Sequence, residues 1–419
     1  MGTLHENKTA PERTLLGAVD TGGHDVAQSL EELRELAAAA GAQVIAVTTQ
    51  NREAPDSASY FGSGKLEEIK ETCAANEIDL LICDDELSPA QLRNLEDALE
   101  LRVIDRTMLI LDIFAARAHS SEGKLQVELA QLKYTLPRLR GQGRGLSRLG
   151  GGIGTRGPGE TKLESDRRHI RSRMHRLEGQ LQALAQRRAL QRGRRKKTGV
   201  ETVAIVGYTN AGKSTLLNAL TQAGVLAEDK LFATLDPTAR ALALPDGRRV
   251  MLVDTVGFLR RLPHHLVEAF HSTLEEAAAA TLILNVCDIS SPDCAEQLQV
   301  TAEQLQQLKA EAPVLQVHNK CDLAPPEVLS MPVLGGGVQI SALHGTGLTE
   351  LLEKIAQALP PRNKTLRFCL PYGIPQLAAR IRAEGSVQSE EFAPQGVVME
   401  ASVPFYLAEE LQSYLLEGV

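Results

Sequence analysis

The stretch from Thr202 to Thr215 constrains the fold of this chain more than any other. An apolar, β-branched run ends at Gly207, and Gly212, Lys213 and Ser214 follow after four residues. This spacing is the phosphate-loop pattern G-x-x-x-x-G-K-[ST], which lies between a strand and a helix. Its glycines let backbone N–H groups surround phosphate oxygens, and the helix amino end adds positive partial charge. The pattern predicts a bound nucleoside triphosphate, with Lys213 at the β- and γ-phosphates and Ser214 on Mg²⁺.

Charge is distributed unevenly along the sequence. The 419 residues carry a net charge of -8, but residues 137–199 contain 18 Lys/Arg and 4 Asp/Glu, a local balance of +14, which leaves -22 for the rest. Such asymmetry predicts a polyanion-binding segment on an otherwise acidic protein; the alternative is a solvated helix face. At about 150 residues per domain, the length predicts two to four domains.

The six cysteines show no C-x-x-C spacing, and we interpret them as reduced, structural thiols of a cytosolic protein. Residues 1–12 are polar, lack the apolar core of a signal peptide and predict a flexible tail. No apolar run approaches the roughly 20 residues that span a bilayer. We therefore expect a soluble, cytoplasmic protein without a membrane span.

Residues 13–106 alternate between strand and helix patterns of similar length. Such alternation predicts a small, doubly wound parallel sheet. The expected strands are 15–19, 43–48, 79–83 and 102–104, and the expected helices are 26–40, 64–75 and 89–99. Within this region, the segment Gly62–Lys65 resembles a second phosphate loop but lacks the first glycine and the final Ser/Thr. A simple helix start is favoured there over an RNA or nucleotide contact.

Residues 107–198 carry two apolar seams with largely 4-3 spacing, which predict two long helices that pack against each other. The seam residues are Phe114, Ala118, Leu125, Leu129, Leu132, Leu136 and Leu139, and then Leu163, Ile170, Met174, Leu177, Leu181 and Leu184. Between them, residues 140–159 hold nine glycines and four arginines. The pattern predicts an antiparallel hairpin with a Gly/Arg-rich tip, followed by a basic linker.

The tip arginines are candidate RNA contacts, because a guanidinium pairs with phosphates and stacks on bases. They are Arg140, Arg144, Arg148 and Arg156. The alternative is an inert linker, although a plain linker has no need of clustered arginines.

Further motifs follow the phosphate loop within residues 199–360. The segment Phe232–Asp236 is too polar to form core. Two strands at 239–244 and 249–253 are joined by Asp246–Gly247, which has hairpin turn chemistry. The second strand leads into Asp254–Gly257, where Asp254 can support the Mg²⁺ shell and the Gly257 N–H can reach a γ-phosphate.

Two later segments predict recognition of guanine. A strand ends in Asn319–Asp322, and a further strand ends in Ser341–Leu343. Asp322 can accept two hydrogen bonds from the guanine N1–H and amine, a donor pair that adenine lacks. Asn319 would brace the loop, and the Ala342 N–H would meet the guanine carbonyl.

The sequence therefore predicts an α/β protein in which a P-loop GTPase domain (199–360) follows a small parallel α/β domain (13–106) and a helical hairpin (107–198). A small α+β docking domain (361–419) completes the chain, with a closing helix expected at 407–416. The predicted nucleotide-binding residues are Gly207, Tyr208, Thr209, Asn210, Ala211, Gly212, Lys213, Ser214, Thr215, Phe232, Ala233, Thr234, Leu235, Asp236, Asp254, Thr255, Val256, Gly257, Asn319, Lys320, Cys321, Asp322, Ser341, Ala342 and Leu343.

Three segments resemble those of a particular family of GTPases. Phe232–Asp236, Gly151–Glu160 and Gly62–Lys65 together resemble the HflX family of ribosome-associated GTPases over essentially the whole chain past residue 12. The resemblance implies a GTPase, monomeric when free, that binds the large ribosomal subunit and its rRNA. It also implies a role in splitting stalled or hibernating ribosomes under stress, and Mg²⁺ bound by Ser214 and Thr234.

In the implied mechanism Lys213, Thr234 and Gly257 are catalytic. Phe258 stands where many GTPases of this fold carry a water-orienting glutamine, which predicts slow turnover that a partner accelerates. The neighbouring Arg260 and Arg261 are interpreted as an ordinary exposed basic pair, and contacts with the switch loops are the alternative. The alternative functions are an ATP- or GTP-dependent RNA remodeller and a GTP-gated RNA-binding regulator without a ribosome target.

Overall fold

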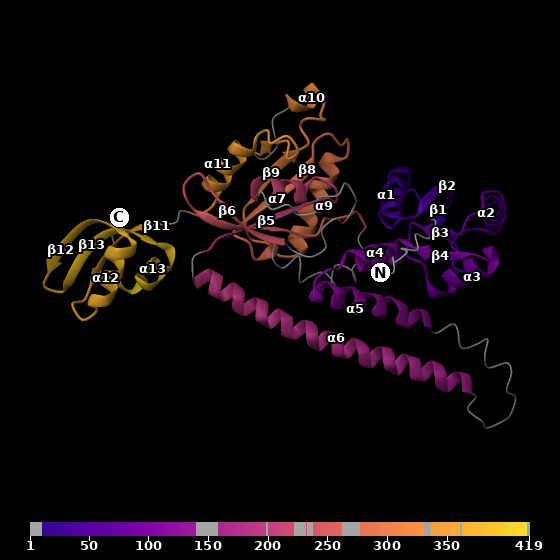
Figure 1. The fold of residues 1–419 in the computed structure, drawn as a ribbon, viewed down its shortest axis with the longest axis horizontal. Coiled ribbons are helices and arrows are strands. Elements are labelled where there is room, and N and C mark those ends of the chain that lie inside the picture. Colours follow the sequence, from indigo (N-terminus) through magenta and orange to yellow (C-terminus); the bar gives the residue numbers. More distant parts are fainter. Residues whose placement is uncertain are drawn as a thin grey trace, which may run out of the picture.

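Three β-sheets lie along the long axis of the molecule in this computed structural model, with the N-terminal and C-terminal domains at opposite ends (Figure 1). The structure describes residues 11–139, 158–197, 200–221, 232, 238–261, 277–330, 337–360 and 363–416. None of the helices in these ranges has the length and apolar content that crossing a bilayer requires.

The N-terminal sheet is fully parallel, in the order β2-β1-β3-β4, so the predicted doubly wound sheet is confirmed. Alternate residues of β1 face opposite sides: Leu16 packs with α1 and α4, and Leu15 packs with α2 and α3. The elements are β1 (Arg13–Asp20), α1 (Val26–Ala39), β2 (Gln43–Asn51), α2 (Ser63–Ala75), β3 (Leu80–Cys83), α3 (Pro89–Leu99) and β4 (Arg102–Asp105). The strand order reverses between β1 and β3.

The first seam was expected to form one long helix, and this prediction is wrong. The chain instead forms α4 (Arg106–Arg117) and α5 (Ser121–Arg138). The break has a local cause, because the Ser120 side chain accepts from the Gly123 N–H at 2.8 Å and so caps a new helix. Phe114 and Ala118 consequently pack in the core of the N-terminal domain, in a cluster that also includes Val127, Ala130 and Tyr134 of α5.

The hairpin itself is built from α5 and the 40-residue helix α6 (Pro158–Lys197), which runs beneath the central domain (Figure 1). Leu177 of the second seam is fully buried, and Arg173 makes a two-pronged ion pair with Glu128 at 2.6 and 2.7 Å. The predicted tip, with Arg140, Arg144, Arg148 and Arg156, lies outside the described residues, apart from its last two positions.

The C-terminal end of α5, which leads into the predicted tip, is bonded to the carboxyl end of β4. The Tyr134 hydroxyl donates a hydrogen bond to Asp105 Oδ2 at 2.6 Å, and the Arg138 guanidinium lies 3.3 Å from the same oxygen. Asp105 is fully buried. The hairpin is therefore joined to the N-terminal sheet through polar contacts as well as through chain connectivity.

The central sheet has the order β10-β9-β8-β5-β7-β6 and is parallel except for the β6–β7 hairpin. That hairpin confirms the predicted turn, where Gly247 has φ +81°. The elements are β5 (Thr202–Gly207), α7 (Lys213–Thr221), β6 (Thr238–Ala243), β7 (Arg249–Asp254), β8 (Leu282–Asp288), α9 (Cys294–Gln307), β9 (Val314–Asn319), α10 (Pro326–Leu329), β10 (Val338–Gln339) and α11 (Leu348–Ala358).

The C-terminal domain is a three-stranded antiparallel sheet in the order β11-β13-β12, packed against α12 and α13. Its elements are β11 (Asn363–Leu370), α12 (Pro375–Glu384), β12 (Ser386–Ala393), β13 (Gly396–Pro404) and α13 (Phe405–Glu410). The closing helix was expected to reach Leu416. It ends at Glu410, because the chain returns to pair with β11, where the Leu416 N–H donates to the Arg367 carbonyl.

Candidate nucleotide-binding site

The predicted nucleotide motifs meet at one edge of the central sheet. Gly207 ends β5, Asp254 ends β7 and Asn319 ends β9. Parallel strands present their carboxyl ends at the same edge, which is where α/β sheets bind ligands. The fold thus brings together three segments that lie far apart in the sequence.

Two glycines of the phosphate loop are required by close contacts. Gly207 has φ +146°, and a Cβ there would lie 2.0 Å from the Val286 carbonyl oxygen. Gly212 has φ +89°, and a Cβ there would lie 2.2 Å from Asn319 Nδ2. Any side chain would therefore displace the loop from β8 or from the Asn319 segment.

Lys213 begins α7 and lies inside the phosphate loop. Its Nζ donates to the Tyr208 carbonyl at 2.6 Å. Burial lowers the pKa of Lys213 to about 8, against the opposing effect of the Asp254 carboxylate. Gly257 passes close by, since a Cβ at that position would lie 2.8 Å from Lys213 Nζ. The loop after β7 therefore comes into direct contact with the phosphate loop.

The pair Ser214 and Asp254 offers hard oxygen ligands beside Lys213. The Ser214 hydroxyl donates to Asp254 Oδ2 at 2.8 Å, and Asp254 is fully buried. Hydroxyl and carboxylate oxygens are the donors that Mg²⁺ prefers in proteins. The residues present thus fit a magnesium ion that also contacts substrate phosphates.

Phe258 follows Gly257 and turns its side chain away from the phosphate loop. It is 2% exposed and packs in an apolar cluster with Val206, Ile283 and Leu305. Backbone hydrogen bonds fix it, because its N–H donates to the Gly207 carbonyl and its carbonyl accepts from the Thr209 N–H. Phe258 is thus a structural link between the phosphate loop and the segment after β7.

The guanine-reading segments are tied to the phosphate loop through Asn319. Its Nδ2 donates to the Ala211 carbonyl and its Oδ1 accepts from the Ala342 N–H, both at 2.9 Å, which confirms the expected bracing. The Ala342 N–H would therefore have to share its hydrogen between Asn319 Oδ1 and the guanine carbonyl. The Ser341 hydroxyl lowers the pKa of Asp322 by hydrogen bonding to its carboxylate.

Part of the predicted site lies outside the described residues, namely Ala233, Thr234, Leu235 and Asp236. Phe232 is described, and its ring packs edge-on against Phe114 of α4 at 4.5 Å between centroids. This predicted nucleotide-site residue therefore contacts the N-terminal domain.

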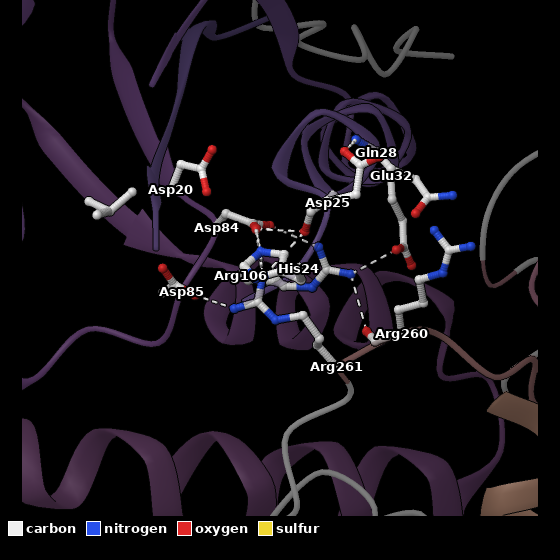
Figure 2. A network of polar contacts seen from close by, with 12 residues as sticks. Asp20, His24, Asp25, Gln28, Glu32, Asp84, Asp85, Arg106, Arg260 and Arg261 are labelled. Carbon is white, nitrogen blue, oxygen red and sulfur yellow. Dashed lines mark hydrogen bonds and ion pairs between the residues drawn. The ribbon is translucent and has the colours of Figure 1, made fainter. Parts of the chain in front are cut away.

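The segment after Phe258 enters the N-terminal domain at the point where its strand order reverses (Figure 2). The Arg261 guanidinium lies 2.8 Å from Asp84 Oδ2 and also binds Asp85, both directly after β3. It also lies 2.9 Å from His24 Nε2. Arg261 thus occupies the sheet edge at which doubly wound folds bind ligands.

A second contact joins the phosphate loop to α1. The Tyr208 hydroxyl donates to Glu32 Oε1 at 2.8 Å and accepts from the Arg260 N–H at 2.9 Å. Glu32 also pairs with Arg106 at 3.2 Å, and Arg106 donates to the Arg260 carbonyl at 3.2 Å. Burial and the Glu32 carboxylate raise the pKa of Tyr208, so it stays a neutral donor.

The interpretation of Arg260 and Arg261 as an ordinary exposed pair is wrong. The Arg260 side chain is only 13% exposed and lies 3.0 Å from Glu296 of α9. Sequence reasoning also missed Glu32, Asp84 and Arg106. Their partners are remote in the sequence, and the one available signal was the run of carboxylates Asp84–Glu86 after a buried strand.

The segment Gly62–Lys65 is confirmed as a helix start, with α2 beginning at Ser63. Lys65 pairs with Glu68 one turn further on, at 2.6 Å. This local ion pair gives the Lys65 ammonium a partner, so no bound phosphate is needed to explain a lysine at this position.

A phosphate loop, an aspartate–glycine pair and an Asn319–Asp322 segment at one sheet edge define the class of P-loop GTPases. Three family models match in chain order: a GTP-binding GTPase N-terminal region at 27–115, a GTP-binding GTPase middle region at 117–195 and a 50S ribosome-binding GTPase at 202–320.

Relatives that match nearly the whole chain identify the family more specifically. GTPase HflX of Caldanaerobacter subterraneus subsp. tengcongensis is 52% identical over 408 residues, covering 97% of this chain and 94% of the relative. GTPase HflX of Lacrimispora saccharolytica is 50% identical, covering 98% of both chains, and that of Escherichia coli is 42% identical, covering 88% of both. The chain belongs to the HflX family of GTPases.

The lowered pKa of Lys213 predicts a pH dependence of stability. Its folded value of about 8 lies below the unfolded value of 10.5, so the unfolded state binds more protons between these values. Stability therefore rises with pH in this window. Between about pH 7.5 and 9.5, we expect the nucleotide-free protein to gain about 1–2 kcal/mol relative to Lys213→Met in denaturant unfolding. Parallel pH profiles of the two proteins would contradict the shift.

The Arg261 contacts predict that Arg261→Gln loosens the segment after Phe258. Losing the charged contacts with Asp84 and Asp85 removes about 1–3 kcal/mol. We expect the Arg260 amide hydrogen, bonded to Tyr208, to exchange with solvent about tenfold faster or more. The control Arg240→Gln changes an exposed arginine on β6 and leaves this rate unchanged. Equal rates in both variants would show that Arg261 does not hold the segment.

Proposed function

We propose that this GTPase docks on the large ribosomal subunit and splits stalled or hibernating ribosomes under stress, acting in the cytoplasm. GTP binding would favour the docked form, and hydrolysis would release it. The name of the matched family model, a 50S ribosome-binding GTPase, supports the choice of partner.

One observation supports the proposal that the nucleotide site is coupled to the hairpin. The carboxyl ends of β3 and β4 are neighbours, with Cys83 opposite Asp105. The residues after β3 bind Arg261 of the nucleotide domain, and Asp105 of β4 binds Tyr134 of the hairpin. A movement of the segment after Gly257 would therefore act on the same sheet edge that supports α5.

The hairpin would supply the RNA contacts. Arg168, Arg171 and Arg176 are exposed on α6, where they can pair with phosphates. The predicted contacts Arg140, Arg144, Arg148 and Arg156 would extend this basic surface at the tip.

At the nucleotide, Lys213 would neutralise the β- and γ-phosphate oxygens, the Gly257 N–H would bind the γ-phosphate, and Thr234 would close over it. Ser214 and Thr234 would hold Mg²⁺, which supplies further charge neutralisation. Guanine would be read by Asp322, whose lowered pKa keeps it an ionised acceptor.

The burial of Phe258 supports a rate of GTP hydrolysis that depends on a partner. Its side chain is buried in the cluster with Val206 and Ile283, so it cannot orient water. Intrinsic hydrolysis would then be slow, and docking would accelerate it by ordering the residues around the γ-phosphate.

Guanine recognition by Asp322 is tested with Asp322→Asn. The amide donates where the carboxylate accepted, so we expect kcat/KM for GTP to fall about 100-fold and XTP to become the better substrate. The control Glu327→Gln neutralises an exposed carboxylate of the same domain and should leave both values unchanged. Retained preference for GTP over XTP would show that Asp322 does not recognise guanine.

Ribosome docking is tested by sedimentation with purified large subunits at about 0.1 M salt. We expect more protein in the pellet with a non-hydrolysable GTP analogue than with GDP. Replacing Arg140, Arg144, Arg148 and Arg156 with alanine should weaken binding and reduce the slope of log affinity against log salt by about three.

The matched control replaces four exposed arginines outside the hairpin, namely Arg34, Arg93, Arg240 and Arg249. If the large subunits do not carry the protein down, the ribosome assignment fails. Equal binding to an unrelated RNA would instead favour a GTP-gated RNA-binding regulator.

A further inference from the structure

The His24 imidazole lies against the Arg261 guanidinium in the contact between the two α/β domains (Figure 2). His24 belongs to the loop between β1 and α1, and its side chain is 29% exposed. Arg261 Nη1 lies 2.9 Å from His24 Nε2, which in turn lies 4.0 Å from Asp84 Oδ2. The histidine thus touches the guanidinium that holds the segment after Phe258 on the N-terminal domain.

The short contact with Arg261 fixes the protonation state of His24 Nε2. A guanidinium only donates hydrogen bonds and keeps its charge in proteins, so the ring nitrogen that faces it must be the acceptor. Nε2 therefore carries no proton, and the imidazole is neutral in the docked arrangement. Protonation would place a second N–H donor and a second positive charge 2.9 Å from Arg261 Nη1, and the contact would break.

Asp84 Oδ2 is the acceptor for which the two cations would compete. This oxygen accepts from the Ser29 hydroxyl at 2.6 Å and lies 2.8 Å from Arg261 Nη1. The other oxygen of the carboxylate, Oδ1, accepts from Arg106 at 3.0 Å. Since Asp84 is 1% exposed, solvent screens its charge little. A protonated His24 would therefore gain a buried carboxylate oxygen at the expense of Arg261.

A protonated imidazole would also find carboxylates on several other sides (Figure 2). The charged groups around the ring come from the end of β1, from α1 and its N-terminal cap, from the segment after β3, from α4 and from the segment after Phe258. They are Asp20, Asp25, Glu32, Asp84, Asp85, Arg106, Arg260 and Arg261. Among them, Arg261 is the cation that lies within hydrogen-bond distance of the ring.

We propose that protonation of His24 releases Arg261 and thereby loosens the segment after Phe258 from the N-terminal domain in acid. The docked arrangement keeps His24 neutral and the released arrangement takes up a proton, so docking is favoured as pH rises and lost as pH falls. Histidine is the side chain that ordinarily changes charge between pH 5 and 8. The proposal needs neither guanine recognition nor ribosome docking, so its outcome is separate from that of the proposed function.

The release would reach the phosphate loop through the residue before Arg261. The Arg260 N–H donates to the hydroxyl of Tyr208, a phosphate-loop residue, at 2.9 Å, and the Arg260 carbonyl accepts from Arg106 at 3.2 Å. Exchange of the Arg260 amide hydrogen with solvent requires the first of these bonds to open. The exchange rate therefore reports how firmly the segment is docked.

The proposal is tested by hydrogen exchange of the Arg260 amide in the nucleotide-free full chain at pH 7.5 and 5.5. The rates are expressed as protection factors, corrected for the intrinsic pH dependence of exchange. We expect the protection factor to be about twofold to fivefold lower at pH 5.5, the size of effect that a partly exposed ion pair supports. His24→Gln presents a neutral acceptor at both pH values, so its protection factor should not change.

Two further variants assign the effect to the pair. In Arg261→Gln the protection factor should be low at both pH values, and adding His24→Gln should change neither value. The control His175→Gln changes an exposed histidine on α6 and should keep the wild-type pH dependence. Equal wild-type protection factors at the two pH values, or the same fall in His24→Gln as in the wild type, overturn the proposal. A wild-type pH dependence that survives in Arg261→Gln would show that Arg261 is not the group released, which overturns it as well.

Discussion

The buried charge cluster around Arg106 is the interaction on which the arrangement of the two α/β domains depends. Arg106 and Asp84 are 3% and 1% exposed, so each needs a partner for its charge. Glu32 and Asp84 supply that partner for Arg106, and their charges outweigh burial and raise its pKa. The nucleotide domain then adds the Arg260 carbonyl and the Arg261 guanidinium. These directional contacts fix the register of the interface more sharply than apolar packing alone can.

Local patterns predicted most of the elements, because strand and helix periods and turn residues act over short distances. Long-range consequences were harder to predict. The split of the first seam into α4 and α5 depends on one capping residue, Ser120, inside an otherwise continuous pattern. The role of Arg261 depends on carboxylates of a separate domain, Asp84 and Asp85, and no periodicity in the sequence connects them.

Within the nucleotide site, the motifs were predicted because each one serves a separate part of the ligand. Of the bonds between them, the bracing by Asn319 was predicted and the link through Phe258 was not. Asn319 joins the phosphate loop to the Ala342 segment, and Phe258 joins the same loop to the segment after β7. The site is therefore one bonded unit, in which a change at the base-reading edge reaches the phosphate loop through a single side chain.

The length of helix α6 would amplify a small movement of the nucleotide site. At 1.5 Å per residue, its 40 residues span about 60 Å. If the helix moves as a rigid rod about the end nearest the nucleotide domain, a tilt of about 5° displaces the opposite end by about 5 Å, roughly one helical turn. A rearrangement at the phosphates too small to disturb the packed core would thus be large enough to make or break contacts at the far end. In such a movement, the length of α6 would set how far its other end is displaced.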